Sequence, residues 1–459
     1  MVYSNTKRVA SIVMTSVLAA AIAGCGGAKA SEQAQDETPV TSQAVQVSAA
    51  QAVEAKQEQS TTTTTTAADA NTSLASMVTD GVIDTSSLFT ERDLQQEVDL
   101  VGATYLSLTS GKDVTITSEG VYVLVGDVED VTVLVDADAA KVQLVLDGVS
   151  ISNTDAPAIY VKNADKVFVT STSGSENVLS VTGAFTADGD TNTDAVIFSK
   201  DDLVLNGTGS LTINSTDNGI SSKDDLKVTG GSYVINCSSD ALEANDSIRI
   251  ADGNFTITTS KDALHSENDE DDSKGFVYIC GGNFTIEAAD DGIHGTTYVQ
   301  IDDGSFTISG QEAIEATYVQ VNNGNISISA SDDGINASQK SSQLTPTIDI
   351  RGGQLSITMA QGDTDALDSN GYLYVSGGNI EINGPFAFDF EWGSEFTGGT
   401  IYVNGEQVTE ITESMMGPGM GGGMMGGHGG MADPGMGGPG GMADPGMGGP
   451  GGGMGGPRG

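Results

Sequence analysis

The sequence has little positive charge, few cysteines and a single tryptophan. Its 459 residues contain 18 lysines and arginines against 63 aspartates and glutamates, a net charge of −45. So few basic groups cannot neutralise a phosphate backbone, which excludes nucleic acid as a partner. Three cysteines in the whole chain exclude a scaffold held together by disulfides. The excess of carboxylates is expected to attract cations, and Ca²⁺ is a hard cation that suits carboxylate ligands.

Long apolar runs are also scarce, and the one present lies close to the first residue. A basic start precedes an apolar run over residues 9–23, which is too short to span a bilayer comfortably. Residues 1–24 are therefore predicted to be an export signal. The run closes on Ile-Ala-Gly-Cys at residues 22–25, which resembles a bacterial lipobox and implies that Cys25 becomes a lipidated N-terminus. The alternative is an ordinary signal peptide followed by a chance cysteine.

Composition divides the rest of the chain into three parts. Residues 25–80 are rich in Ser, Thr, Gln and Ala, and residues 413–459 are rich in Gly, Met and Pro. In neither stretch do apolar residues recur at a regular spacing, so burial of apolar side chains cannot offset the conformational entropy lost on ordering. The first stretch is therefore predicted to be a disordered linker and the second a disordered tail. Residues 81–412 between them are predicted to form the folded domain.

A tetrapeptide recurs through this domain at intervals of 21 to 32 residues. It begins with an acid or Asn, and its third residue is always apolar. The two longest intervals contain polar insertions, residues 268–274 and 338–346, which we interpret as loops. The eight copies begin at Asp194, Asn218, Asp240, Asp262, Asp291, Glu312, Asp333 and Asp365.

Each tetrapeptide is preceded by two alternating segments with a glycine turn between them. In one unit, Ile248 and Ile250 alternate with polar residues, the turn lies at residues 252–253, and Phe255 and Ile257 alternate in the second segment. Alternation of this kind indicates strands with one buried face. Three short strands in about 21 residues, repeated in phase, predict an all-β solenoid of stacked parallel strands, a β-helix. A β-sandwich of hairpins is the alternative, but it would not require the same residues at the same phase in every unit.

The start of the domain is less regular. Residues 114–181 are rich in strand-forming residues and are predicted to form the first coils. Residues 88–108 are predicted to cap the N-terminal end, because an uncovered terminal coil would leave an open strand edge.

Stacking the units would align their acidic residues in a column. Neighbouring strands lie about 4.8 Å apart, so the first and fourth tetrapeptide positions would place carboxylates at that spacing. Each adjacent like-charged pair costs about 1 kcal/mol in water and several-fold more near a protein surface. The column is therefore either well solvated or neutralised by cations. Turn formation at the coil corners explains Asp and Asn at the first position, but it does not explain Glu312 or the second acids Glu243, Glu315 and Asp368.

Catalytic groups are not evident in the pattern. An acid in nearly every unit is an architectural feature and not a selected pair of the kind a glycosidase uses. His265 and His294 fall on adjacent units at the fourth position, where they would share a cation or be exposed. A Ca²⁺-dependent lyase would need a basic residue beside the acids, and Arg249, Lys261 and Arg351 are the nearest candidates.

Several segments resemble one known family. Residues 142–151, 158–165, 198–203 and 220–231 are similar to the carbohydrate-binding β-helix family of bacterial surface proteins, the cellulose- and pectin-binding proteins of anaerobic clostridia. The resemblance covers roughly residues 88–405. It implies a right-handed parallel β-helix similar to that of pectate lyases, with bound Ca²⁺ and affinity for acidic plant polysaccharide. It implies binding without cleavage. Carried onto this chain, it implies that the Ca²⁺ ligands fall among Asp240, Glu243, Asp262, Asp290, Asp291, Glu312, Glu315, Asp332, Asp333 and Asp365.

The expected function follows from these points. We expect an exported monomer, lipid-anchored at Cys25 to the outer face of the bacterial membrane, that binds a polygalacturonate-like polymer through bridging Ca²⁺ and is not an enzyme. A uronide lyase or hydrolase, and a Ca²⁺-stiffened surface protein or adhesin, are the alternatives. A neutral glycan would instead need stacking aromatic residues, and the ones available are Trp392, Tyr298, Tyr318, Tyr372 and Tyr374.

Overall fold

A computed structural model of the chain describes residues 78–79, 82–83 and 85–413, except residues 269, 272 and 363. The predicted export signal, Cys25, nearly all of the predicted linker and all but the first residue of the predicted tail lie outside these residues. Within the described part of the chain, no helix combines the length and the apolar character needed to cross a membrane.

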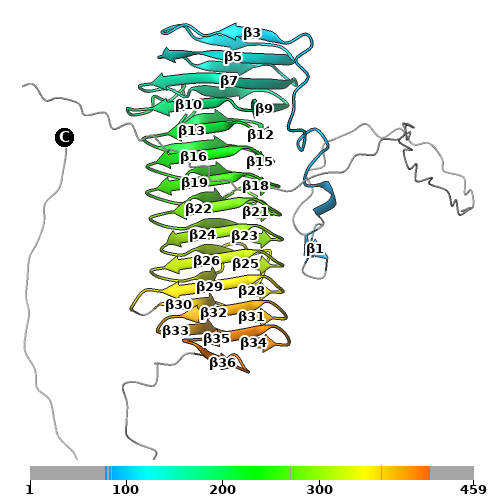
Figure 1. Cartoon of the computed structure of the whole chain (residues 1–459), viewed down its shortest axis with the longest axis vertical. Coiled ribbons are helices and arrows are strands. Elements are labelled where there is room, and N and C mark those ends of the chain that lie inside the picture. Colours follow the sequence, from blue (N-terminus) through cyan, green and yellow to red (C-terminus); the bar gives the residue numbers. More distant parts are fainter. Residues whose placement is uncertain are drawn as a thin grey trace, which may run out of the picture. The chain divides into compact units, whose positions relative to one another are not determined.

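The described chain is a solenoid of parallel strands with three strands in each coil (Figure 1). One coil consists of β15 (Asp225–Val228), β16 (Ser232–Cys237) and β17 (Leu242–Ala244). The next coil begins at β18 (Ser247–Ile250), which pairs in parallel with β15, and the following strands pair with β16 and β17 in the same way. In these coils strand n therefore lies on strand n+3, and the stacking produces three parallel sheets. The predicted all-β, parallel β-helix is confirmed.

The three sheets are named here by the order of their strands within a coil. Sheet I contains β9 (Lys166–Ser171), β12 (Asp202–Gly207), β15, β18, β21 (Phe276–Ile279), β28 (Thr347–Ile350), β31 (Tyr372–Val375) and β34 (Gly393–Phe396). Sheet II contains β10 (Glu176–Val181), β13 (Ser210–Asn214), β16, β19 (Asn254–Thr259), β22 (Asn283–Glu287), β24 (Ser305–Gly310), β26 (Asn325–Ala330), β29 (Gln354–Met359), β32 (Asn379–Asn383) and β35 (Thr400–Val403). Sheet III, built mainly from the tetrapeptides, contains β4 (Val114–Ile116), β6 (Val133–Asp136), β8 (Ile159–Asn163), β11 (Ala195–Ser199), β14 (Asn218–Ser222), β17, β20 (Leu264–Ser266), β27 (Ile335–Ala337), β30 (Asp365–Ser369) and β33 (Phe386–Phe390).

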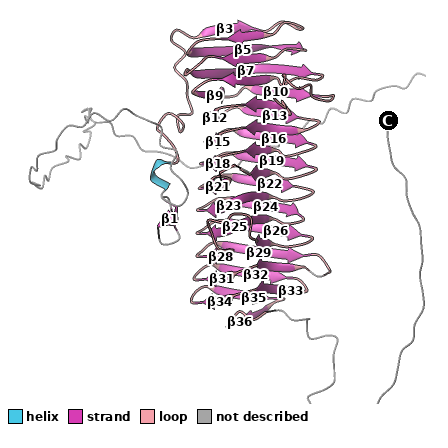
Figure 2. Cartoon of the chain, turned by 180° about the vertical axis from the view of Figure 1, so that it is seen from behind, coloured by secondary structure: helices cyan, strands magenta, loops and turns pink. Residues whose placement is uncertain are grey.

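Some strands are long enough to belong to two sheets. β23 (Ile293–Ile301) and β25 (Ile314–Val321) begin in sheet III and continue into sheet I without a turn. β5 (Gly120–Glu129) and β7 (Lys141–Asn153) extend from sheet I into sheet II, and β3 (Thr104–Ser107) pairs with β5. Strands dominate the described chain, as Figure 2 shows; the one described helix is the short 3₁₀ turn η1 (Thr85–Ser87), which follows the hairpin of β1 (Val78–Thr79) and β2 (Val82–Ile83).

The core lies inside the coils and is built by alternation. In β19 every second side chain is buried and the others are exposed, and the same pattern recurs in β16, β22, β24, β26 and β29. The buried positions stack in register, so that like residues meet along the axis. The rings of Phe255, Phe284 and Phe306 stack with centroids 4.6 Å apart and planes 2° apart. Burial of such columns supplies the main stabilisation, because one coil alone cannot shield its apolar side chains.

The turn between sheets I and II requires glycine. Gly304 has φ of +136°, a conformation that is strained for residues with a side chain. A Cβ atom at this position would also lie 2.7 Å from the ring of Phe306. The glycine turn predicted from the sequence therefore brings the backbone at Gly304 onto the aromatic stack of the core.

The segment before the first coil differs from the prediction. Residues 88–96 do not cap the N-terminal end; they lie along the outside of sheet I. Leu88 packs against Phe276 and Tyr298, and the Gln96 Nε2 donates to the Thr229 carbonyl oxygen at 2.8 Å. Local sequence gives no sign of this contact, because its partners are more than a hundred residues away.

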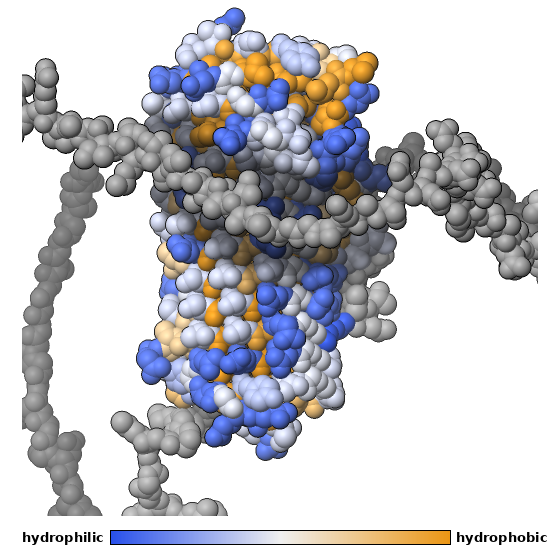
Figure 3. Space-filling model, viewed as in Figure 1, coloured by the Kyte–Doolittle hydropathy of each residue, from blue (hydrophilic) through white to orange (hydrophobic). Residues whose placement is uncertain are grey.

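The two ends of the stack are covered unequally. β3 lies over the first coil, and Val101 beside it is 90% exposed; Figure 3 shows hydrophobic residues gathered at this end. At the other end, β36 (Glu406–Val408) folds back antiparallel on β35, and Ile411 is buried. The antiparallel pairing ends the parallel stack, so another coil cannot be added there in the same way.

Candidate functional site

The fourth tetrapeptide positions stack in register along sheet III, as the sequence predicted. Pairing between successive strands brings Glu243 beside His265, His265 beside His294 and His294 beside Glu315. The column continues through Asn336 to Asp368. These side chains point away from the core, because the third position of each tetrapeptide is buried among the apolar residues of the interior.

The first tetrapeptide positions form a hydrogen-bond ladder. One carboxylate oxygen of Asp240 accepts the backbone N–H of Asp262 at 3.2 Å, and one of Asp262 accepts that of Asp291 at 2.9 Å. Asn218 and Asp333 make the same bond to the next coil. Because Asn serves as well as Asp, this bond explains the recurrence of both residues without a cation. It leaves the second carboxylate oxygen of each Asp for other contacts.

Two insertions enclose a groove beside this column. Residues 267–275 connect β20 to β21, and residues 338–346 connect β27 to β28, which confirms that both polar insertions are loops. Between them, β23 and β25 cross the same corner without a loop and form the floor. The groove has a volume of about 860 Å³. Its charged and imidazole-bearing lining residues are Lys261, Asp262, His265, Glu267, Glu270, Asp290, Asp291, His294, Glu312, Glu315 and Lys340.

At one end of the groove, acids and bases are already paired. The Nδ1 atom of His265 lies 3.0 Å from Asp240 Oδ2 and 3.4 Å from Asp262 Oδ2. Lys261 Nζ lies 2.9 Å from the same Asp240 oxygen. Both aspartates are almost fully buried. The protein's own basic groups therefore face the two carboxylates here.

The middle of the groove contains more acid than base. His294 Nδ1 lies 2.8 Å from Asp291 Oδ2 and 3.1 Å from Glu315 Oε2. Lys340 Nζ lies 2.9 Å from the other oxygen of Glu315. Glu312 joins the same cluster, where Asn336 donates to it at 3.1 Å. Three carboxylates thus meet two basic side chains.

The close approach of these carboxylates shifts the pKa values of His294 and Glu312. Burial opposes the charge of His294, yet hydrogen bonds and charge from Asp291 and Glu315 raise its pKa to about 9. Burial, with repulsion from Glu315 and Asp291, raises the pKa of Glu312 to about 8. Near neutral pH His294 is therefore charged, while Glu312 retains its proton unless a further cation enters the cluster.

The ligand atoms of each cluster determine which metal ion it suits. Among the described residues, three groups of acids and histidines bring their ligand atoms within 4.8 Å of one another. Two of these include His265 or His294, and imidazole nitrogen is not a ligand that Ca²⁺ favours. The third, Asp291 with Glu312 and Glu315, is all oxygen. It fits Ca²⁺, since this ion takes six to eight oxygens from carboxylates, carbonyls and water.

The residues predicted from the sequence divide into two sets. Asp240, Asp262, Asp291, Glu312 and Glu315 lie in the three groups. The other five lie outside them. Glu243 is paired with Lys223 at 3.2 Å, and Asp290 accepts from Gln311 at 3.0 Å. Asp332 is exposed, and Asp333 accepts the backbone N–H of Asp365 in the ladder described above.

The basic candidates for a lyase divide in the same way. Arg249 lies 3.0 Å from Asp225, and Arg351 lies 2.7 Å from Asp349, both on the outside of sheet I. Lys261 lines the groove. Lys340 also lines it, and sequence reasoning missed this residue because its insertion was interpreted only as a loop. The sequence feature that could have identified Lys340 is a basic residue within the insertion that follows the acidic unit at Asp333.

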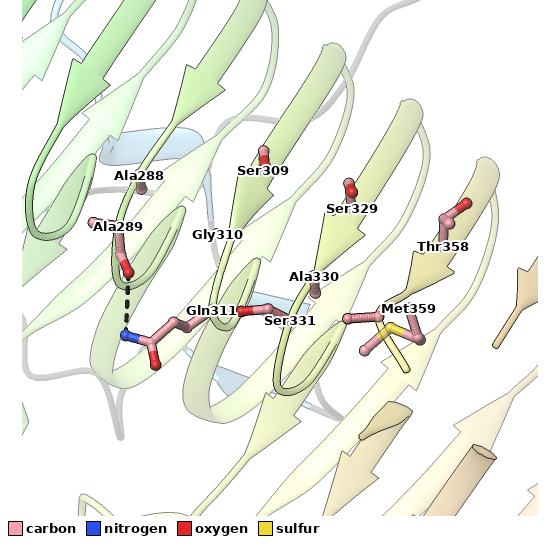
Figure 4. Close-up of a pocket in the computed structure, with 11 residues that line it drawn as sticks. Ala288, Ala289, Ser309, Gly310, Gln311, Ser329, Ala330, Ser331, Thr358 and Met359 are labelled. Carbon is pink, nitrogen blue, oxygen red and sulfur yellow. Dashed lines mark hydrogen bonds between the residues drawn. The ribbon is translucent and has the colours of Figure 1, made fainter. Parts of the chain in front are cut away.

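A smaller hollow of about 380 Å³ lies where strands of sheet II end (Figure 4). Its wall is formed by small side chains such as Ser309, Ser329 and Ala330, and the side-chain amide of Gln311 donates to the Ala289 carbonyl oxygen at 3.1 Å. No charged side chain lines this hollow, so it lacks the acidic and basic groups that line the groove.

Further along the column, carboxylates accumulate around Asp368. Burial and repulsion from Asp333, Asp389 and Asp365 raise its pKa to about 7. The unfolded value is about 3.9, so the native state binds this proton more tightly. The contribution of this proton to the free energy of unfolding is fully present below about pH 4 and is lost as pH rises through 7. For a half-buried group we expect about 1–2 kcal/mol after allowance for solvent screening.

This predicts that Asp368→Asn flattens the pH dependence. Urea unfolding in chelator at pH 5 and pH 8 measures it: the wild-type chain should lose stability between the two, and the variant should lose less. An equal loss in both would show that Asp368 is not the titrating group.

Comparison with known proteins assigns the chain to a family. Residues 110–366 and 309–412 match the family described as carbohydrate-binding domain-containing protein. The matched residues cover more than half of the chain, and the chain belongs to this family.

Two individual proteins are similar to this chain. A carbohydrate-binding domain-containing protein of Acetivibrio thermocellus is 39% identical over 127 residues, which are 27% of this chain and 44% of that protein. The match therefore spans less than half of the relative's length. The solved structure of the polysaccharide lyase-like protein from C. thermocellum, a gadolinium derivative, is 23% identical with a TM-score of 0.31, covering 65% of this chain and 96% of that one.

Proposed function

We propose that this protein binds an acidic polysaccharide such as polygalacturonate at the cell surface, through Ca²⁺ held in the groove, and does not cleave it. The observation that carries the proposal is the all-oxygen cluster of Asp291, Glu312 and Glu315 on the groove floor. Its three carboxyl groups outnumber the two basic side chains that face them, and Glu312 retains its proton near neutral pH, so a divalent cation would take the place of that proton. Family membership supports carbohydrate as the ligand class.

The charge of the chain supports a bridge of this kind. A polyuronide is itself an anion and would be repelled by an acidic surface. Three protein carboxylates do not fill the six to eight positions around Ca²⁺, so carboxylates of the polymer and water molecules would occupy the remainder. Asp291, Glu312 and Glu315 would hold the ion, while Lys261 and Lys340 at the groove wall would contact further uronate groups.

The protonation of the groove favours binding over lyase chemistry. Elimination from a uronide requires an unprotonated base next to the substrate. Although burial works against its charge, hydrogen bonding and charge from Asp240 raise the pKa of Lys261 above its usual value. The pKa of His294 is about 9. Both groups therefore hold their protons near neutral pH. A uronide lyase is the second candidate, because Lys261 stands among acids in the groove.

The proposal includes where the protein acts. Export by residues 1–24 and lipid attachment at Cys25 would place a monomeric binding domain on the outer face of the membrane, with residues 25–80 as its linker. A surface location would bring the groove into contact with polymers too large to enter the cell.

Binding of the mature chain to polygalacturonate, first in Ca²⁺ and then in chelator, tests the proposal. We expect saturable binding in Ca²⁺, loss of binding in chelator, and no release of unsaturated or reducing ends. Product formation would favour the lyase. Binding that survives chelator would show that Lys261 and Lys340 suffice without Ca²⁺, and no binding in either condition would leave a Ca²⁺-stiffened surface protein.

A further inference from the structure

We propose that the side chains of Asp93 and Lys227 are joined by a covalent amide bond, which fastens the segment before the first coil to sheet I. This modification site is separate from the groove, since neither residue lines it. The inference does not depend on the carbohydrate-binding role proposed above. It rests on a carboxyl group and an amine that are buried together although they come from distant parts of the sequence.

Asp93 is fully buried where the segment meets sheet I. Two bonds within its own turn fix the side chain: Asp93 Oδ2 accepts the Thr90 N–H at 2.9 Å, and Thr90 Oγ1 accepts the Asp93 N–H at 3.2 Å. The other oxygen, Asp93 Oδ1, has no hydrogen-bond partner among the described residues. Leaving a buried carboxylate oxygen without a hydrogen bond is costly, so its presence needs a physical reason.

Two lysines of sheet I face this carboxyl group, both at distances longer than a hydrogen bond. Lys166 on β9 lies 3.7 Å from Asp93 Oδ1, and Lys227 on β15 lies 3.6 Å from Asp93 Oδ2. Lys166 has a second acid, Asp202, at 3.3 Å. Lys227 is the more deeply buried of the two, and its other acid, Asp225, is 4.0 Å away. Lys227 is therefore the amine that is less engaged elsewhere and the better nucleophile.

The segment lies against sheet I closely enough to hold the two groups together. A Cβ atom at Gly230 would lie 2.1 Å from Gln96 Oε1, so no side chain fits between the segment and the sheet there. On the other side of Asp93, the guanidinium of Arg92 lies 4.3 Å from the ring centroid of Phe168. Contacts on both sides of Asp93 keep the carboxyl group next to the amine and exclude water, and confinement of this kind accelerates a reaction between two groups.

The reaction is a condensation that needs no further reactant. Although burial opposes its charge, the Thr90 N–H and the charge of Lys227 lower the pKa of Asp93, and burial with repulsion from Arg249 lowers the pKa of Lys227. The starting state is thus an ion pair with an ammonium that loses its proton more readily than an exposed lysine. One proton passes to the carboxylate, and the amine nitrogen bonds to Cγ. A second proton passes by way of Asp225 to the departing oxygen, the Cγ–O bond breaks, and one water leaves.

The bond would make the attachment of the segment permanent. Leu88 and Phe89 of the same segment cover Tyr278 and Tyr298 on sheet I, so release of the segment would expose these rings. A segment held by ion pairs and packing opens and closes, whereas a covalently attached segment keeps this face covered. A pull on the N-terminal side of the chain would then be carried into the coils by a covalent bond.

Tryptic digestion of the denatured mature chain tests the bond by mass spectrometry. Trypsin cleaves after lysine and arginine, so an unmodified chain yields separate peptides 93–112 and 228–249. An amide at Lys227 blocks cleavage after that residue. We expect one product in which residues 93–112 are joined to residues 224–249, with the summed mass of the two peptides less one water molecule. Free peptide 93–112 in full yield, with cleavage after Lys227, would overturn the proposal.

Matched variants separate the bond from the ion pair. Lys227→Arg keeps a positive charge opposite Asp93 but lacks the lysine amine, so it should release peptide 93–112 unjoined. Lys166→Arg should still give the joined product. A product in which residues 93–112 are joined to residues 163–200, the peptide that contains Lys166, would overturn the assignment to Lys227. The deciding result is read on the wild-type chain, so a variant that fails to fold does not obscure it.

Discussion

Replacing Phe284 with alanine is expected to destabilise the β-helix by about 3–5 kcal/mol. Phe284 is 3% exposed, and its ring stacks on both Phe255 and Phe306. Removing it deletes the middle member of the column and leaves a cavity that neighbouring coils cannot fill, because their rings are fixed by the backbone register. Denaturant unfolding of the wild-type and variant chains measures the difference.

The matched variant is Phe284→Ile. Ile326 occupies the equivalent position two coils further on, paired in register with Phe306, so isoleucine is compatible with the interior at this phase. We expect Phe284→Ile to cost clearly less than Phe284→Ala. An equal loss of unfolding free energy in the two variants would contradict the stacked core, because it would show that apolar atoms filling this space do not stabilise the fold.

Neutralising two acids on the groove floor is expected to remove Ca²⁺ binding. The variant Asp291→Asn with Glu312→Gln leaves one carboxylate in the all-oxygen cluster, and affinity should fall by at least about 100-fold, since loss of supporting residues alone costs 10–100-fold. Ca²⁺ calorimetry measures this. Binding to the wild-type chain should also release protons, because Glu312, with its pKa of about 8, must ionise to bind the cation.

The control variant replaces the same number of carboxyl groups outside the cluster. Asp290→Asn with Asp332→Asn also removes two carboxyl groups, and neither residue belongs to the three ligand groups. It should bind Ca²⁺ with nearly the wild-type affinity. A similar loss in both variants would show that the cation responds to the net charge of the protein and not to a defined site.

Much of the fold could be predicted because its determinants are local. The alternation at Phe255 and Ile257, the glycine turn before them and the phase of Asp262 each follow from the geometry of one coil. Repetition then fixes the stacking, since strands that share a phase bury one continuous column. The register of the fourth tetrapeptide position, including His265 beside His294, was predictable for the same reason.

The site was less predictable because its determinants are not periodic. The acids of the column cannot be told apart in the sequence. In the structure, the two loops on either side of the groove enclose only the acids near Asp291 and Glu315. Lys340 reaches Glu315 from an insertion whose length gives no indication of where it folds. Residues 88–96 were misassigned because Gln96 and Thr229 are joined by a hydrogen bond between distant segments. Contacts of this kind depend on the assembled surface and not on the repeat.

The ladder also changes how the acidic column is understood. One oxygen of Asp240 and one of Asp262 accept backbone N–H groups, so these acids stabilise the coil corners whether or not a cation is present. Cation binding must therefore be argued from the remaining oxygens and from residues outside the ladder. Glu312 and Glu315 are such residues, which is why the all-oxygen cluster carries the functional proposal.

Lysine footprinting with polygalacturonate in Ca²⁺ tests the central claim most directly. Acetylation of the mature chain, read by mass spectrometry, compares Lys261 and Lys340 in the groove with Lys141 and Lys162, which are 43% exposed and lie on β7 and β8. We predict that the polymer protects Lys261 and Lys340 in Ca²⁺, that chelator removes this protection, and that Lys141 and Lys162 react equally throughout. Unchanged labelling of Lys261 and Lys340 while the polymer is bound would contradict the groove as the binding site.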